Sequence, residues 1–311
     1  MKKHILITSI SAKVPLIKTV IKSKNKFDKS ISVYGGDIDE NCIARYFVDN
    51  FIFMSNLEIM SIDDFIAVCD SREIKYIIPT RDADVLYFSG YKKKLLNNGI
   101  YLFAPNIDTV KICFDKLEFS ARTKDMLSIP SSKDIREINS AKYVVKERFG
   151  SGSNNIALNV DKTTALKFSK RLKETIYQPY IQGQEFSIDS YVAKNKKCIA
   201  CIVRSRDIVK NGESQISTYV YDEFLEKKII SFVESLNITG HSVTQVIKHN
   251  NTYSIIECNT RFGGASTLSY KMGLESFYWF LLEVADEKIN FKLNNTKLQL
   301  VRIAEDQYFE C

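Results

Sequence analysis

The chain has 311 residues, of which 45% are hydrophobic and 26% charged, and a formal net charge of +7 from 44 basic and 37 acidic side chains. It contains only 12 glycines and 5 prolines, where average usage would give roughly 22 and roughly 16, so collagen-like, linker-like and Pro-rich scaffolds are excluded. The lysines are spread along the chain, which favours a solvated surface over a nucleic-acid patch.

The sequence also indicates a compartment. No run approaches the roughly 18 uncharged apolar residues needed for a membrane span, and the apolar run at 5–7 is too short for a secretory signal. The seven cysteines are odd in number and scattered, which suggests reduced thiols. We therefore expect a cytoplasmic protein that binds neither membrane nor nucleic acid.

Two cysteines, Cys198 and Cys201, have the spacing of a metal or redox pair. They lie in an apolar stretch typical of a strand, and the three histidines do not supply a matching ligand spacing. We interpret the pair as core thiols.

The first hundred residues alternate short β-rich runs with helical stretches. Strands are expected at 5–9, 31–34, 76–79 and 101–103, with a turn at 35–37, and helices at 14–22, 62–69 and 87–97. This alternation predicts a parallel, doubly wound sheet. The loop at 9–14 contains no glycine, so it lacks the fingerprint of a dinucleotide site, although Asp37 would suit a ribose hydroxyl.

A boundary is expected near 106–109. Asp115 and Glu118 form a variant of the capping box, and the helix they open should run to about Leu127. Lys116 falls in the first turn of that helix, where the helix dipole disfavours a cation. Either a bound phosphate or a solvated surface position would account for it.

The remainder changes to an α+β pattern. Strands are expected at 143–146, 155–158, 185–192, 197–203, 243–248 and 253–258, and helices at 163–172, 222–236 and 265–284, the last interrupted at Gly273.

Two motifs suggest a nucleotide. Lys146 ends a strand and precedes a loop of small residues, whose amides could surround phosphate oxygens; the loop comprises Gly150, Ser151, Gly152 and Ser153. A flexible hairpin is the alternative. Further on, a short connector leads to Glu185, which shares a strand face with Ser187 and Asp189. The connector could hold a purine edge by its backbone and Glu185 a ribose, or the segment is simply an amphipathic strand.

Two further motifs carry charge at a spacing of two residues. Arg204 and Arg206 lie on one face and favour a phosphate or carboxylate ligand, unless they pair with nearby acids. Glu257, Asn259 and Arg261 project to one side of a strand end. With Gln245 on the preceding strand, they form a site for a hard cation and a polyphosphate.

Taken in order, these motifs resemble the ATP-grasp superfamily, and the nearest likeness is to single-module relatives of the carbamoyl-phosphate synthase large chain. The resemblance rests on Asp115-Lys116, on Lys146 with its loop, on Tyr180-Ile-x-Gly-x-Glu185, on Gln245 and on Glu257-x-Asn259-x-Arg261, with 77–80 in the preceding domain. It implies a pre-ATP-grasp domain at 1–108 and a two-lobed ATP-grasp fold at 109–311, with a small lid lobe at about 115–182 and a C-terminal lobe at about 183–311.

The resemblance also assigns roles. Lys116 and Lys146 would contact phosphates, and the loop at 150–155 would act as the lid. Gln178, Tyr180 and Ile181 would form the adenine hinge, largely by backbone, with Glu185 near the ribose. Gln245, Glu257 and Asn259 would bind Mg²⁺ or Mn²⁺, and Arg261 would steady the transferring phosphate.

We therefore predict an ATP-dependent ligase that activates a carboxylate as an acyl phosphate and joins it to an amine, or less favourably to a thiol. Arg204 and Arg206 are candidates for holding the acceptor carboxylate or the acyl phosphate, and Ala265 and Ser266 for lining the acceptor pocket, which Thr80, Arg81 and Asp82 could reach. The partners would be small molecules, and a homodimer is compatible with the sequence. The alternative is an ATP-binding module without ligase chemistry.

Overall fold

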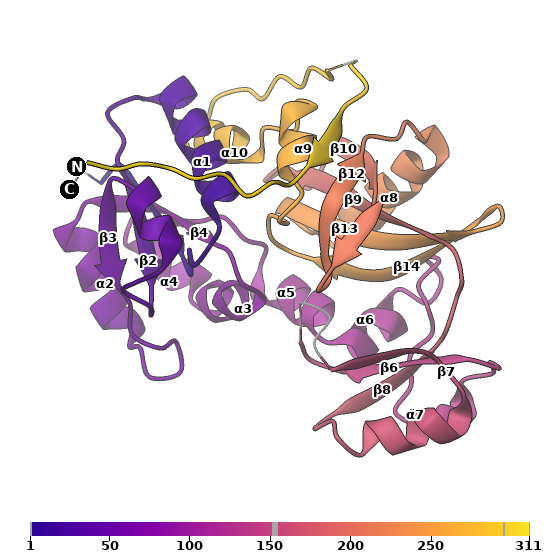
Figure 1. Cartoon of the computed structure of the whole chain (residues 1–311). Coiled ribbons are helices and arrows are strands. Elements are labelled where there is room, and N and C mark those ends of the chain that lie inside the picture. Colours follow the sequence, from indigo (N-terminus) through magenta and orange to yellow (C-terminus); the bar gives the residue numbers. More distant parts are fainter. Residues whose placement is uncertain (1, 151–154, 295, 311) are drawn as a thin grey trace.

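The computed structural model describes residues 2–150, 155–294 and 296–310. Within these ranges the strands form a five-stranded, a four-stranded and two three-stranded sheets, with helices packed on them (Figure 1). None of the described helices is long and apolar enough to cross a membrane.

The first hundred residues build the five-stranded sheet. Its strands are parallel and lie in the order β3-β2-β1-β4-β5, an order typical of doubly wound folds. The strands are β1 (His4–Thr8), β2 (Val33–Asp37), β3 (Asn50–Phe53), β4 (Ile74–Pro79) and β5 (Tyr101–Leu102). The helices are α1 (Val14–Phe27), the short 3₁₀ helix η1 (Ile43–Phe47), α2 (Ile62–Ser71), α3 (Asp82–Gly90) and α4 (Lys92–Asn97).

Both faces of this sheet are covered, because successive side chains of a strand point to opposite faces. Ile5 and Ile7 of β1 belong to a core cluster that contains residues of α1, whereas Leu6 belongs to a cluster formed with α2, α3 and α4. Because both faces of the sheet are buried, its strands carry apolar residues at nearly every position. The predicted doubly wound parallel sheet is therefore present.

Three details of this part differ from the sequence prediction. The turn expected at 35–37 is the end of β2, because Gly35 and Gly36 are packed against Ile10 and Met54, where a Cβ atom would clash. The strand β3 was not predicted. The helix expected at 87–97 begins earlier, at Asp82, and is divided between α3 and α4.

The chain then forms a small lobe with its own sheet. Two helices, α5 (Ile107–Phe114) and α6 (Lys116–Arg122), lead into the antiparallel sheet β7-β6-β8. This sheet consists of β6 (Tyr143–Glu147), β7 (Ile156–Val160) and β8 (Thr175–Pro179), preceded by the short η2 (Ile135–Glu137) and covered by α7 (Lys162–Ser169). The strand β8 was not predicted.

A four-stranded antiparallel sheet forms the centre of the C-terminal part, in the order β10-β9-β13-β14. Its strands are β9 (Gln184–Val192), β10 (Cys198–Ser205), β13 (Gly240–His249) and β14 (Thr252–Asn259), and α8 (Glu223–Ser235) packs against it. A smaller sheet, which was not predicted, joins β11 (Ile208–Lys210), β12 (Glu213–Thr218) and β15 (Gln299–Val301).

The C-terminal helices pack against the N-terminal sheet and so connect the N-terminal and C-terminal parts of the chain. The predicted helix at 265–284 is two helices, α9 (Thr267–Lys271) and α10 (Ser276–Val284), separated by Gly273 at φ +109°. Phe277, Trp279 and Phe280 of α10 enter the same core cluster as α1 and the first sheet. The last residues run back toward the N-terminus (Figure 1), where Phe309 packs against Tyr46 and Phe47 of η1.

Candidate functional site

A cavity of about 850 Å³ lies between the small lobe and the four-stranded sheet. Thirteen of the predicted site residues line it: Lys116, Lys146, Gly150, Gln178, Tyr180, Ile181, Glu185, Arg204, Arg206, Gln245, Glu257, Asn259 and Arg261. The remaining three, Ser151, Gly152 and Ser153, lie outside the described residues. Residues that are up to 145 positions apart in the sequence are thus brought to one cavity by the fold.

The floor of the cavity is a row of polar side chains that crosses the four-stranded sheet. In the strand register, Arg204 of β10 lies opposite Ser187 of β9, Ser187 opposite Gln245 of β13, and Gln245 opposite Glu257 of β14. Residues paired in this way share a face of the sheet. We call this set of four the polar row.

The Glu257 end of the polar row offers oxygen ligands. Gln245 and Glu257 are cross-strand neighbours, and Asn259 donates from Nδ2 to Glu257 Oε1 at 3.2 Å. Because the amide nitrogen of Asn259 is used in this way, its oxygen stays available. One carboxylate and two amide oxygens are ligands of the kind that Mg²⁺ accepts, so this donor set fits the ion.

Lys146 of β6 reaches the same end of the cavity. It is 7% exposed, and its ammonium group makes no hydrogen bond to the described residues. Burial lowers its pKa to about 8, although the carboxylate of Glu257 favours the charged form, while the neighbouring Lys116 disfavours it further. A buried cation without a partner is suited to an anionic ligand.

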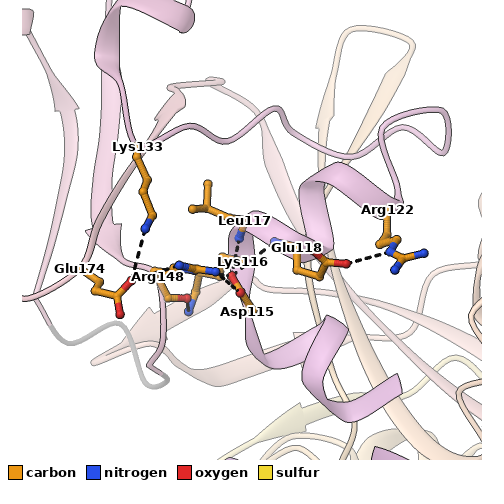
Figure 2. Close-up of polar contacts among 8 residues, drawn as sticks. All are labelled: Asp115, Lys116, Leu117, Glu118, Arg122, Lys133, Arg148 and Glu174. Carbon is orange, nitrogen blue, oxygen red and sulfur yellow. Dashed lines mark hydrogen bonds and ion pairs between the residues drawn. The ribbon is translucent and has the colours of Figure 1, made fainter. Parts of the chain in front are cut away.

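Lys116 is held at the edge of the cavity by the N-terminus of α6 (Figure 2). Its Nζ donates to the carbonyl of Gly150 at 2.7 Å, which ties α6 to the end of β6 and its loop. The carboxylate of Asp115 caps the helix through the amides of Leu117 and Glu118 and also binds Arg148 at 2.7 and 2.5 Å.

Two predictions for this helix are wrong, and Figure 2 shows the contact that corrects the first of them. The N-cap at Asp115 is present, but Glu118 does not complete a capping box, because its carboxylate accepts from Arg122 at 2.8 Å. The helix ends at Arg122 instead of near Leu127. The Thr123 hydroxyl bonds back to the Phe119 carbonyl, and Leu127 adopts φ +66°, outside the helical region.

The proposed adenine hinge lies at the end of β8. Gln178 is 3% exposed, and its Nε2 donates to Ser131 Oγ at 2.8 Å, so its side chain serves the protein interior. The N–H of Tyr180 donates to the Lys142 carbonyl at 2.9 Å. Recognition of a base here would therefore depend on the other backbone groups of 180 and 181.

Each of the three predicted arginines is paired with a carboxylate. Arg204 Nε donates to Asp189 at 2.7 Å, and Arg206 Nε donates to Glu185 at 3.0 Å. Arg261 binds Asp82 with two hydrogen bonds of 2.8 Å. The alternative of pairing with nearby acids is thus realised for Arg204 and Arg206, while both side chains still line the cavity.

Asp189 is the centre of a buried network behind the polar row. Its side chain is fully buried and accepts from Arg204, His241, Ser266 and Ser269. Burial alone would raise its pKa, but Arg204 and the hydrogen bonds outweigh burial and hold the pKa well below its usual range. The predicted role of Ser266 in lining the pocket is wrong, since its hydroxyl points to Asp189; Ala265 does line the cavity.

The N-terminal part of the chain contacts the site through Asp82. Asp82 begins α3 directly after β4 and holds Arg261, a contact between two parts of the chain 179 residues apart. Thr80 instead bonds to the backbone of Thr8 and Ser9 and accepts from Lys13. Asp37, which the sequence offered for a ribose, accepts from the amide of Ser11 at 2.7 Å and so secures the loop after β1.

The paired cysteines pack in the core of the four-stranded sheet. Cys201 is buried, and Cys198 packs against the same cluster. Burial raises the pKa of Cys198 to about 12, as expected for an unreactive thiol. No group of three or more His, Cys, Asp or Glu side chains suited to a metal occurs among the described residues.

The sequence analysis assigned no role to several residues that contact or accompany the predicted site residues. Asp189 was noted for its strand face but received no role, and Ser214, which lines the cavity from the unpredicted β12, was not singled out. The spacing of Ser187 and Asp189 with Arg204 on an adjacent strand could have indicated the ion pair. Nothing in the sequence around Ser214 marks it.

Comparison with known families matches two parts of the chain. A model described as the ATP-grasp domain matches residues 113–265, and one described as the PylC-like N-terminal domain matches residues 5–103. A search of curated protein sequences found no match.

Solved structures of similar fold include biotin carboxylases. The biotin carboxylase domain of the Hydrogenobacter thermophilus 2-oxoglutarate carboxylase, in complex with MgADP and bicarbonate, has a TM-score of 0.74 at 13% identity, covering 93% of this chain and 71% of that chain. The Campylobacter jejuni biotin carboxylase in a β,γ-ATP complex has a TM-score of 0.74 at 15% identity, covering 94% and 74%.

A third similar structure is the phosphoribosylglycinamide synthetase of Anaerococcus prevotii, with a TM-score of 0.67 at 13% identity, covering 92% of this chain and 75% of that chain. At these identities the likeness concerns the fold. The predicted fold class, a parallel-sheet N-terminal domain followed by an α+β part with antiparallel sheets, is confirmed.

Proposed function

Because this chain joins a PylC-like N-terminal domain to an ATP-grasp domain, we propose that it is an ATP- and Mg²⁺-dependent ligase that joins a carboxylic acid to an amine. The observation that carries the proposal is the meeting of two features in one cavity: the buried Lys146, which has no hydrogen-bond partner among the described residues, and the oxygen donors of Gln245, Glu257 and Asn259.

In this proposal the nucleotide lies between the small lobe and the four-stranded sheet. Backbone groups at 180 and 181 face the base, and Glu185, paired with Arg206 at 3.0 Å, is placed for the ribose. Lys146 and Lys116 contact the phosphates. Gln245, Glu257 and Asn259 would hold Mg²⁺, which when bound neutralises phosphate charge.

The first chemical step is a phosphoryl transfer. An oxygen of the substrate carboxylate attacks the γ-phosphorus of ATP, the bond from that phosphorus to the β–γ bridging oxygen breaks, and ADP leaves. The product is an acyl phosphate. Arg261, held in place by Asp82, stabilises the charge that develops on the transferring group, so its contribution is positioning and electrostatics.

In the second step the amine nitrogen attacks the carbonyl carbon of the acyl phosphate. The bond from that carbon to the phosphate oxygen breaks, inorganic phosphate leaves, and the amine loses a proton to solvent. Exclusion of water matters here because water would otherwise hydrolyse the acyl phosphate. Arg204 and Arg206 line the cavity beyond Gln245 and are proposed to contact the organic substrates.

The direct test is release of ADP and phosphate from Mg-ATP in the presence of pools of carboxylic acids and amines. We expect at least one acid pool to stimulate release and an amine pool to increase it further. Binding of Mg-ATP without stimulation by any pool would overturn the ligase and favour an ATP-binding module without ligase chemistry.

A further inference from the structure

A single residue, Asp115, separates α5 from α6, and an ion pair fixes it to the end of β6. Its two carboxylate oxygens accept from Nε and Nη2 of Arg148 at 2.7 and 2.5 Å (Figure 2). A bidentate pair of this kind fixes orientation as well as distance. The same carboxylate caps α6 through two amides of its first turn. We call the two segments that meet here, 114–116 and 148–150, the junction.

Further contacts join the same two segments. The rings of Phe114 and Phe149 stack with their centroids 5.7 Å apart. The backbone amide of Lys116 donates to the Arg148 carbonyl at 3.3 Å, and its ammonium group donates to the Gly150 carbonyl at 2.7 Å. Every residue of one segment of the junction thus contacts the other segment, so the start of α6 and the end of β6 are held together as one unit.

The guanidinium of Arg148 is engaged by the protein. In addition to the two bonds to Asp115, its Nη1 donates to Glu174 at 3.2 Å, so that each of its three nitrogens is bound to a carboxylate. One face of the guanidinium lies over the ring of Phe149, 4.9 Å from the centroid. Arg148 is not among the residues that line the cavity. Its geometry therefore suits the support of other residues and not contact with a phosphate.

Both lysines that are proposed to contact phosphates are attached to the junction. Lys116 is part of it, and Lys146 lies on β6 two residues before Arg148. Both lysines line the cavity. Burial lowers the pKa of Lys146 most, and the charge of Lys116 lowers it further, which means that the two cations repel each other. Two like charges stay close together only where the surrounding structure holds them.

The ion pair at the junction is suited to that task. Burial raises the pKa of Asp115, but Arg148 and the amides of α6 outweigh burial and hold the pKa below its usual value. The side chains of Asp115 and Arg148 are 14% and 24% exposed, whereas those of the pair Asp134–Arg136 in the same lobe are 35% and 80% exposed. A shielded bidentate pair keeps its geometry better than a pair in solvent does.

We propose that Asp115 and Arg148 are positioning residues, which hold Lys116 and Lys146 at the spacing that the phosphates of one nucleotide require. This inference rests on the proposed function and deepens it, because it assigns two residues that do not line the cavity to the nucleotide site. The competing explanation is that the junction only stabilises the small lobe.

The test measures equilibrium binding of two ligands to the full chain, a non-hydrolysable ATP analogue with Mg²⁺ and adenosine, which has no phosphate. Asp115→Asn keeps a residue that caps helices well but removes the charge and one of the two acceptors for Arg148. We expect the affinity for the ATP analogue to fall about tenfold, the effect of weakening one hydrogen bond to a charged group. The affinity for adenosine should change by less than about twofold. Loss of the folded small lobe would lower both affinities.

Two further variants separate positioning from stability. Glu174→Gln is the matched control, because it breaks the other ion pair of Arg148 and leaves the bonds to Asp115 intact; both affinities should stay within about twofold of wild type. Arg148→Lys keeps a cation beside Asp115 but loses the fork, so the affinity for the ATP analogue should fall about threefold, less than in Asp115→Asn. Chemical denaturation of each variant shows that it is folded.

The proposal is overturned if Asp115→Asn and Arg148→Lys bind the ATP analogue as tightly as the wild type does, if Glu174→Gln weakens it equally, or if the affinity for adenosine falls as much as that for the ATP analogue. Failure of the ligase proposal looks different. In that case the variants lose affinity for the ATP analogue selectively, but no combination of acid and amine pools releases ADP and phosphate.

Discussion

The two ends of the polar row treat charge differently. At the Glu257 end, Lys146 is buried and makes no hydrogen bond to the described residues, from which Glu257 receives only the side-chain amide of Asn259. At the Arg204 end, the guanidinium is compensated by Asp189 inside a network of four hydrogen bonds. The first arrangement leaves charges for a ligand to complete, whereas the second fixes the position of a side chain before any ligand arrives.

The largest change in stability should come from removing the charge of Asp189, the carboxylate that compensates Arg204. Asp189→Asn leaves Arg204 buried without compensation, and we expect the free energy of unfolding to fall by about 3 kcal/mol or more, measured by chemical denaturation. Glu213→Gln is the control: Glu213 pairs with Arg302, but its side chain is 62% exposed, and a surface pair contributes only about 0–1 kcal/mol. Equal effects of the two changes would contradict the comparison.

The opposite result is expected at the Glu257 end. Glu257→Gln keeps the shape but removes the one carboxylate of the proposed metal site, so Mg-dependent ADP release should fall at least about 10²-fold. The free energy of unfolding should change by less than about 0.5 kcal/mol, because no ion pair is broken. Glu118→Gln, on α6 outside the cavity, should leave turnover unchanged. Normal turnover of Glu257→Gln would refute the metal assignment.

Arg261 shares a feature with each end of the polar row. It is paired with a carboxylate, that of Asp82, as Arg204 is with Asp189, and it lines the cavity together with Glu257. Asp82→Asn should loosen its position and lower kcat about tenfold, while the KM for ATP changes by less than about twofold. The loss should be in kcat, since Arg261 is proposed to act on the transferring group. A change in the KM for ATP alone would show that Asp82 serves nucleotide binding instead.

A smaller effect is expected from pH at Lys146. Its pKa of about 8 in the folded protein lies below the usual lysine value, so its charge is lost as the pH rises through 8. The affinity for Mg-ATP should therefore decrease between pH 8 and 9.5, by up to about tenfold per pH unit. In Lys146→Arg the charge persists throughout this range, so the decrease should largely disappear.

The lowered pKa of Lys146 also makes the stability of the ATP-free protein depend on pH. Stability should rise with pH, whereas the affinity for Mg-ATP should fall. Between pH 8 and the unfolded value near 10.4, the unfolded chain binds more protons at this lysine than the folded chain does. The contribution of Lys146 to stability in the absence of ATP should therefore increase with pH in that window. A decrease there in wild type relative to Lys146→Arg would contradict the pKa assignment.

The smallest effect is expected from the paired cysteines on β10. Replacement of both Cys198 and Cys201 by serine should leave ADP release within about twofold of wild type, because their thiols pack in the core and do not line the cavity. Loss of stoichiometric zinc, or of activity, in the double variant would reject the interpretation as core thiols.

These contrasts also explain what could be predicted from the sequence. The alternation of short apolar runs, such as the one at 5–7, with helical stretches is a local signal, and it predicted the parallel sheet correctly. The spacing of two between Glu257, Asn259 and Arg261 is equally local, and all three residues line the cavity. Local patterns were thus sufficient to predict features that depend on residues within one strand or one short segment.

Pairing across the fold was not predictable in the same way. Asp82 is 179 residues from Arg261, and its role depends on how the N-terminal sheet meets the C-terminal part. The end of β2 was taken for a turn, because Gly35 and Gly36 usually signal one, whereas here they allow close packing against Ile10 and Met54. Both cases are decided by tertiary contacts that no short pattern reports.

The most direct test of the central claim is to trap the acyl phosphate. The protein is incubated with Mg-ATP, hydroxylamine and the carboxylic acid that stimulates ADP release, and the hydroxamate is quantified. We predict one hydroxamate for each ADP formed in the wild type, and almost none of either product with Glu257→Gln. ADP formed without hydroxamate in the wild type would contradict activation of a carboxylate by phosphoryl transfer.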